Sequence, residues 1–308
     1  MHSMNCPARS HPRWFIQTAI AGLILILGAC RATPSVADSL TGLALAEEMM
    51  AQGDWARATD LLSEFEADNF EGEDQERFKL RLARSLMEIG EPWDAFKIIE
   101  NFNEEHPFGR YLSTAQDIEF KAGAQLIKSD ISFWIFSSDE EDGRIILEHF
   151  TIHHPRRGDL LPDALRLLGE CAFSNERWNE ARKWFQRLIS NHPQSEWKVL
   201  ARFRVAMCRF NLLVGPQYDI EAMSRARNAL SDFLELETEN PAFVATTGAA
   251  LRTVERWLAL KHIDIAEFYE TVGNHQGHIH HLEKAAAEYP ETPGGKRARE
   301  AIARLKAR

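Results

Sequence analysis

The sequence has few of the residues that interrupt helices, with 17 glycines and 12 prolines among 308 residues. It also lacks runs in which β-branched and polar residues alternate, which is the pattern of a half-buried strand. Hydrophobic residues make up 44% of the chain, enough for an extended core, and most of them recur every three or four positions. These features argue against a strand-rich fold and predict an all-α protein.

The sequence also lacks the short motifs of common enzyme classes. It contains no HExxH motif, no GxSxG motif and no glycine-rich phosphate-binding loop. Its acidic residues are spread over the expected helix surfaces, where they add solubility. The net charge of −10 argues against a nucleic-acid partner, because binding the phosphate backbone requires basic residues. We therefore expect no enzymatic activity, no cofactor and no nucleic-acid partner.

An apolar run near the N-terminus, residues 14–29, follows a segment that contains Arg9 and Arg13. A basic stretch before a short apolar core predicts a signal peptide, because the run is shorter than the roughly 20 residues of a membrane span. The run ends in LGAC, whose last residue is Cys30, and this resembles the bacterial lipobox. The resemblance implies that residues 1–29 are removed and that Cys30 carries a lipid. The alternative is an uncleaved anchor.

Residues 30–40 are expected to form a short tether between the lipid and the folded part, since they are largely polar and contain a proline. Removal of the signal peptide deletes two arginines and no acidic residue, so the rest of the chain is more acidic still. Arg31 occupies the position where the enteric lipoprotein system uses an aspartate for inner-membrane retention. That resemblance favours the periplasmic face of the outer membrane of a Gram-negative bacterium.

The clearest helical pattern lies in residues 161–193, which predict two amphipathic helices joined by a tight turn. Gly169 and Ala181 are small where two helices would cross, and Phe185 is large enough to fill the gap between repeats. Pro193 lacks the N–H group that a continuing helix would need. The order of these residues resembles the tetratricopeptide repeat, a helix pair of roughly 34 residues.

A single helical hairpin cannot bury its own apolar face, so one repeat implies neighbours on both sides. Dipeptides that end in proline recur at intervals of 38 to 49 residues, and each predicts the end of a unit. They are His106-Pro107, His154-Pro155, His192-Pro193, Asn240-Pro241 and Tyr289-Pro290. The predicted fold is an all-α solenoid of about six tetratricopeptide-type hairpins, followed by a basic C-terminal capping helix.

Within this solenoid we place N-terminal repeats in residues 41–160, and C-terminal repeats with the capping helix in residues 161–308. The third unit contains an insertion, residues 128–143, whose centre is too apolar for an ordinary loop. The apolar residues are Phe133, Trp134, Ile135 and Phe136. They either fold back as a plug or form an exposed docking patch, in which Phe133, Trp134 and Phe136 are the candidate partner-binding residues.

A row of basic residues is predicted on the first helix of the second unit. Arg77, Arg81 and Arg84 recur there with helical spacing. Such a row can pair with a terminal carboxylate or an acidic peptide, because guanidinium groups bind carboxylates through two hydrogen bonds. The alternative is an ordinary solvated helix face.

Histidines gather near the C-terminus, where His278 and His281 have the spacing of helical metal ligands. A pair of imidazoles at this spacing suits zinc or nickel. The alternative is that these are incidental surface histidines, because no paired carboxylate is expected on the same face. They remain weak candidates, and we predict no metal site from the sequence.

Two cysteines, Cys171 and Cys208, occupy similar places in consecutive units, where small residues pack. We expect two buried thiols. The alternative is a disulfide, which needs Cα atoms within roughly 7 Å, a distance that neighbouring parallel helices rarely allow.

The lipobox, followed by hairpins that end in proline dipeptides, resembles the BamD family of outer-membrane assembly lipoproteins. The most similar stretches are residues 178–201, the GPQYD sequence at 215–219 and residues 265–293. The resemblance implies a scaffold of the machinery that folds β-barrel proteins into the outer membrane. Its partners would be the barrel-forming subunit and unfolded outer-membrane proteins.

Two features depart from that family, namely six expected hairpins where it usually has five, and the apolar insertion. One alternative is a periplasmic repeat protein that coordinates cell-wall synthesis or envelope constriction. Another is a metal- or ligand-binding lipoprotein.

Overall fold

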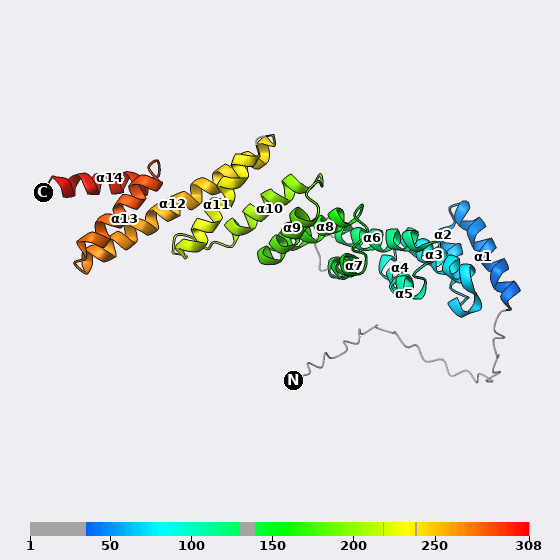
Figure 1. Ribbon diagram of the computed structural model, residues 1–308. Helices are drawn as coiled ribbons and strands as arrows, with labels where there is room; N and C mark the ends of the chain where they lie inside the picture. The colour runs from blue at the N-terminus through cyan, green and yellow to red at the C-terminus, as the bar shows by residue number, and fades with distance from the viewer. Residues whose placement is uncertain (1–34, 130–138, 218, 238, 308) are drawn as a thin grey trace, which may run out of the picture.

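The computed structural model describes residues 35–129, 139–217, 219–237 and 239–307. Within these ranges the regular structure is entirely helical, as the composition predicts. The helices follow one another in a long row, with the first hairpin at one end and the C-terminal helix at the other (Figure 1). None of the helices in these ranges is both long and apolar enough to cross a bilayer.

Six helical hairpins form the row in the described part of the chain, as predicted. The first three are α1 (Val36–Ala51) with α2 (Trp55–Leu62), α3 (Gly72–Glu88) with α4 (Pro92–Ile99), and α6 (Leu112–Ser129) with α7 (Asp139–His153). The next three are α8 (Leu161–Ser174) with α9 (Trp178–Asn191), α10 (Lys198–Asn211) with α11 (Ile220–Leu236), and α12 (Pro241–Thr271) with α13 (His275–Glu288). The short helices η1 (Ala67–Asn69) and α5 (Phe102–Glu105) lie in connections, and α14 (Pro293–Lys306) follows the last hairpin.

Helix starts are set by side chains that cap free backbone N–H groups. Ser35 and Asp38 form a capping box at the start of α1. Asn240 accepts a hydrogen bond from the backbone N–H of Phe243, and Pro241 is the first residue of α12, where its missing N–H has no cost. The prediction that Asn240-Pro241 marks the end of a unit is confirmed, since the dipeptide lies between α11 and α12, but it does so by starting α12 and not by directly following a helix end. The other four dipeptides do follow helix C-termini.

The α8/α9 hairpin shows why small and large residues alternate in the repeat. The side chain of Phe185 in α9 has no exposed surface. A Cβ atom placed on Gly169 of α8 would lie 2.7 Å from the ring of Phe185, so only glycine admits the ring there. Burying such a side chain contributes about 1.5–3 kcal/mol relative to leaving it exposed. The hairpin is therefore stabilised mainly by apolar packing.

The helices on either side of the predicted insertion extend into it. Residues 128–129 belong to α6 and residues 139–143 belong to α7, whereas residues 130–138 lie outside the described residues. One hydrophobic cluster joins α6 and α7 to α8, with Phe150 and Leu168 among its members. Apolar packing is thus continuous across residue 160, and the division of the chain at that residue stays a prediction.

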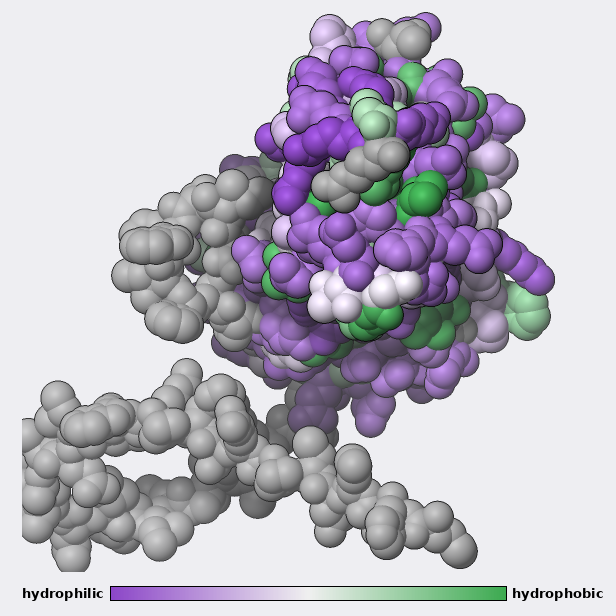
Figure 2. Space-filling view, turned by 90° about the vertical axis from the view of Figure 1, so that its left-hand side faces the viewer, coloured by the Kyte–Doolittle hydropathy of each residue, from purple (hydrophilic) through white to green (hydrophobic). Residues whose placement is uncertain are grey.

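Helix α14 covers the last hairpin, as expected of a capping helix. Its Ala298 is fully buried and packs in one cluster with Ile263 of α12 and Leu282 of α13. The view onto this end of the row shows mostly hydrophilic side chains, with the hydrophobic ones in small separate areas (Figure 2). A polar outer face of this kind ends the stacking of repeats.

Candidate functional site

The basic row of α3 borders a hollow formed by α1, α2 and α3, which we call the α1–α3 hollow. Its volume is about 440 Å³. It is lined by Glu47, Met50, Ala51, Trp55, Arg77, Arg81 and Arg84. The three arginines therefore do not lie on a featureless helix surface, because they gather around a concave space.

Two of these arginines are already paired within the chain. The Nε–H groups of Arg81 and Arg77 donate to the same carboxylate oxygen of Glu47, at 2.7 and 3.0 Å. Burial raises the pKa of Glu47, but the hydrogen bonds from the two arginines outweigh this effect and hold the pKa below its usual range. Arg77 and Arg81 thus tie α3 to the preceding hairpin, and their charges are partly matched inside the protein.

Arg84 differs from its two neighbours. Its side chain is exposed, and no other described residue forms an ion pair with it. The guanidinium lies over the ring of Trp55, 5.6 Å from the ring centroid. This cation–π contact holds the planar group at the edge of the hollow without using its N–H donors. Arg84 can therefore offer two parallel hydrogen bonds to a carboxylate.

His278 and His281, the weak metal candidates, do not form a pair of ligands. His278 is only 8% exposed, and its Nδ1 atom lies 2.8 Å from the carbonyl oxygen of Ala266 in α12. It shares the buried face of α13 with Leu282 and Ala285, which follow at four and seven residues. The interpretation of His278 as an incidental surface histidine is therefore wrong, because helical spacing turns it into the hairpin.

His281 pairs instead with His262 of α12, with the two Nδ1 atoms 3.0 Å apart. One ring must donate a hydrogen and the other must accept it, so at least one of them is neutral. Burial, together with the nearby His281, lowers the pKa of His262 to about 4. His262 is therefore uncharged near neutral pH, burial also lowers the pKa of His281, and the pair acts as a polar contact within the α12/α13 hairpin.

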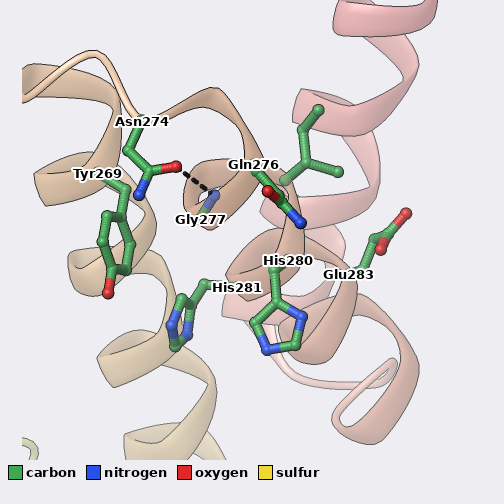
Figure 3. Close-up of a pocket in the computed structure, with 8 residues that line it drawn as sticks. Tyr269, Asn274, Gln276, Gly277, His280, His281 and Glu283 are labelled. Carbon is green, nitrogen blue, oxygen red and sulfur yellow. Dashed lines mark hydrogen bonds between the residues drawn. The ribbon is translucent and has the colours of Figure 1, made fainter.

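A hollow of about 480 Å³ adjoins this pair on the α12/α13 surface. In Figure 3, His281 lies beside Tyr269, whose ring stacks on it with centroids 5.6 Å apart. Asn274 accepts a hydrogen bond from the N–H of Gly277 at 2.9 Å and so forms one edge of the hollow. His280 is the exposed imidazole of the group. His281 is engaged by Tyr269 and His262, whereas His280 and Glu283 also line the hollow.

A further polar cluster, which no sequence motif marks, lies between α6 and the C-terminal end of α7. Glu119 of α6 contacts two imidazoles: Oε1 lies 2.8 Å from Nδ1 of His149, and Oε2 lies 2.7 Å from Nε2 of His154. Glu119 is 2% exposed and His154 is 5% exposed. Thirty and 35 positions separate the glutamate from the two histidines, so no sequence motif marks this trio.

The charges within this trio stabilise one another. Burial raises the pKa of Glu119, but the hydrogen bonds and charges of the two histidines outweigh that effect and lower the pKa. The hydrogen bond to Glu119 raises the pKa of His149, although burial acts in the opposite direction. The trio therefore favours an ionised carboxylate and a proton on His149.

Several residues that the sequence singled out lie outside the described residues. These are the signal peptide, Cys30, Phe133, Trp134 and Phe136. Cys171 and Cys208 are described, and both are buried and free, which confirms the prediction of two thiols. Burial raises the pKa of each thiol to about 12, so neither is a reactive nucleophile at neutral pH.

Comparison with known proteins identifies the repeat. Residues 163–195 match the tetratricopeptide repeat family. This segment contains most of α8 and all of α9, the same hairpin that the sequence pattern indicated. No curated protein sequence matches the chain.

Three solved structures give low overall similarity. Pseudomonas aeruginosa PilF is 9% identical with a TM-score of 0.31, over 85% of this chain and 97% of PilF. MamA of AMB-1 is 14% identical with a TM-score of 0.24, over 80% of this chain and 96% of MamA. A Podospora anserina protein with kinesin light chain TPR-like repeats is 14% identical with a TM-score of 0.21, over 82% of this chain and 95% of that protein. These scores are too low to establish a shared overall arrangement.

The matched segment and the six hairpins together show a helical-hairpin solenoid of the tetratricopeptide type. In such solenoids each hairpin contacts mainly its neighbours, which leaves a long surface available for binding. A scaffold of this type indicates a role in protein–protein interaction.

Proposed function

We propose that the protein is a lipid-anchored, periplasmic interaction scaffold at the outer membrane, and that it serves the machinery that assembles β-barrel proteins there. The lipobox-like sequence that ends at Cys30 supports the anchor, and the row of hairpins supports the scaffold. The partners in this proposal are the barrel-forming subunit of that machinery and unfolded barrel proteins. The observation that carries the binding role is the α1–α3 hollow with Arg84 at its edge.

The α1–α3 hollow suits a carboxylate on an extended chain. Among the described residues, three arginines and one carboxylate, that of Glu47, line it. A terminal carboxylate or an acidic side chain can accept two hydrogen bonds from Arg84, while adjoining apolar side chains contact Trp55 and Met50. Affinity is expected to be modest, because an unfolded segment loses conformational entropy when it binds.

A second charged hollow, between α7 and α9, is less suited to this role. Its volume is about 570 Å³. Arg144 is paired with Glu141 and Glu148, and Arg187 donates to the carbonyl oxygen of Thr151 at 3.0 Å. Since Arg144 and Arg187 are engaged within the protein, a ligand that used these two side chains would have to displace existing bonds.

The partner proposal is tested by mass spectrometry of proteins that co-purify with the tagged chain after mild detergent extraction of native envelopes. We expect a large β-barrel subunit with periplasmic domains. Recovery of peptidoglycan synthases or constriction proteins instead would overturn the assembly role and favour the cell-wall alternative. Cys30→Ala is expected to block lipid attachment and cleavage, and a normally processed variant would contradict the anchor.

The binding role of the α1–α3 hollow is tested with a labelled synthetic peptide that ends in a free carboxylate, taken from the C-terminus of a barrel protein. Arg84→Ala should weaken binding roughly tenfold, since a hydrogen bond to a charged group contributes about 1.5–3 kcal/mol. Arg299→Ala is the matched control, because Arg299 is exposed and lies in α14. Amidation of the peptide should weaken binding to the wild type but not to Arg84→Ala. Equal affinities for the wild type and Arg84→Ala would refute this site.

A further inference from the structure

The Glu119, His149 and His154 trio brings three metal-ligating groups together in the described part of the chain. One carboxylate oxygen and one nitrogen from each histidine all lie within 4.8 Å of one another. Nδ1 of His149 and Nε2 of His154 each contact an oxygen of the Glu119 carboxylate. We propose that these three side chains form a binding site for a divalent transition-metal ion, with zinc as the best match.

The donor set favours zinc over the harder cations. Two imidazoles and one carboxylate are the three protein ligands of a familiar type of zinc site, in which a fourth position stays open. Calcium and magnesium prefer six or more oxygen ligands, so a site with two nitrogen donors suits them poorly. Other first-row divalent transition-metal ions that accept imidazole ligands should also bind. Their affinities are expected to rise from manganese through iron, cobalt and nickel to copper, with zinc below copper.

The two nitrogens contact different oxygens of Glu119, so the ligand atoms must rearrange to surround one ion. Bonds of about 2.0–2.2 Å in a tetrahedral site place neighbouring ligand atoms about 3.3 Å apart. The present nitrogen–oxygen distances of 2.7 and 2.8 Å are shorter, because hydrogen atoms bridge them. An ion would replace these bridging hydrogens, so binding should release protons and strengthen as the pH rises.

The two helices hold the trio in a fixed place. A Cβ atom on Gly143 of α7 would lie 2.9 Å from the carbonyl oxygen of Gly123 in α6, so the backbones of the two helices that carry Glu119 and His149 approach closely. Phe96 packs edge-on against His149, and Phe150 packs edge-on against His154. These contacts restrict the imidazoles before any ion binds, which lowers the entropic cost of assembling the site.

An ion can reach the trio from the side of His149. The His149 side chain is 20% exposed, whereas those of Glu119 and His154 are each 3% exposed. Glu100 and Glu104 act on His149 through their negative charges. Acidic residues beside the exposed ligand favour a cation over an anion at this opening.

The first test is titration of the tag-free, chelator-stripped full chain in detergent. Cobalt(II) is the spectroscopic probe, and zinc is measured by competition with a chelating dye. We expect one equivalent of each ion to bind, visible absorption bands of a low-coordinate cobalt site, and a higher melting temperature with zinc. Failure of the wild-type chain to bind a stoichiometric ion would overturn the proposal and leave the trio as a hydrogen-bonded structural contact.

Variants locate the bound ion. His149→Gln should weaken zinc binding by more than about tenfold, because it removes a direct ligand. Even the loss of a residue that only hydrogen-bonds to a ligand lowers metal affinity about 10–100-fold. His281→Gln is the matched control. Like His149, His281 is a partly exposed histidine, but it contacts the imidazole of His262 and lies outside the trio. Circular dichroism and the melting temperature without metal establish that both variants fold. If His281→Gln removes the bound ion and His149→Gln does not, the metal belongs to the tail histidines and the proposal is wrong.

Discussion

Two neighbouring hairpins, α6/α7 and α8/α9, differ in how the interface between their two helices is filled. In both, glycine lets the two helices approach closely. The Cβ of an alanine at Gly169 would meet the ring of Phe185, whereas one at Gly143 would meet the backbone of α6 at Gly123. The α8/α9 hairpin thus fills its interface with a phenyl ring, and the α6/α7 hairpin brings backbone against backbone.

The same two hairpins differ in what they bury. The α8/α9 core is apolar, with Phe185, Leu188 and Ala181 fully buried. The α6/α7 hairpin buries the charged side chain of Glu119 against His149 and His154. Apolar packing needs no particular protonation state, whereas a buried carboxylate must keep its partners. The comparison therefore predicts a hairpin insensitive to pH beside one that depends on it.

The largest expected effect comes from the apolar hairpin. Phe185→Ala should lower the free energy of unfolding by about 3–5 kcal/mol, because it removes a fully buried ring and leaves a cavity. Phe108→Ala is the control: Phe108 is 99% exposed, so its loss should change stability by less than about 0.5 kcal/mol. Urea denaturation followed by circular dichroism measures both. Similar small effects for the two variants would mean that α8/α9 does not depend on this ring. A loss of stability in Phe185→Ala that varied with pH would contradict the prediction that this hairpin is insensitive to pH.

A smaller effect is expected from the polar trio. In metal-free buffer, Glu119→Gln should lower the free energy of unfolding by about 1–3 kcal/mol, the cost of leaving buried polar groups poorly paired. The measurement is urea denaturation of both proteins across a series of pH values. His149→Gln is the companion variant, because it removes the other charge of the pair and should reduce the same pH-dependent contribution.

The pH dependence of the Glu119→Gln effect follows from the two pKa shifts. The pKa of Glu119 is lowered in the folded protein, so its contribution to stability is fully present above pH 4.5, the ordinary pKa of the side chain. This contribution is lost as the pH falls through the lower pKa of the folded state. The pKa of His149 is raised in the folded protein, so its contribution to stability is fully present below pH 6.5, the ordinary pKa of the side chain. This contribution is lost as the pH rises through the higher pKa of the folded state. The difference between wild type and variant should therefore be greatest between these values and smaller at higher pH. A difference that is constant with pH would contradict the charged pair.

The sequence predicts the hairpins well because their determinants are local. Gly169 and Phe185 lie 16 residues apart within one repeat, and helical periodicity places them on facing sides. The number of hairpins and the capping helix follow from the same periodicity. Asn240-Pro241 also marks a boundary between hairpins, although its proline occupies a first helical position, which the asparagine cap distinguishes from a helix end.

The polar sites are less predictable because they combine helices that are distant in sequence. Glu119 and His154 lie 35 residues apart, so no motif connects them. Similarly, helical spacing predicts Arg77 and Arg81 as a row, but nothing in the sequence marks Glu47, 30 and 34 residues earlier, as their partner. Helical spacing could have found one feature that was missed: His278 precedes Leu282 and Ala285 on the buried face of α13.

The smallest expected effect has the opposite sign and concerns the turn of the α8/α9 hairpin. The second residue before the second helix has positive φ in four hairpins. It is Gly53, Gly90 and Gly273 in three of them, with φ between 74° and 88°, but Glu176 in α8/α9, with φ of 57°. A non-glycine residue in this left-handed region costs roughly 1–2 kcal/mol.

Glu176→Gly should therefore stabilise the protein, although glycine adds about 0.4–1 kcal/mol of unfolded-state entropy. We expect a net gain in the free energy of unfolding of about 0.5–1 kcal/mol, measured by urea denaturation. Asn175→Gly is the matched control, because Asn175 precedes Glu176 with φ of −90° and glycine there should only destabilise. A gain in the control equal to that of Glu176→Gly would show that flexibility of the turn, and not relief of backbone strain, controls its stability. The hairpin that best fits the repeat pattern would then be no more strained at its turn than the three that carry glycine.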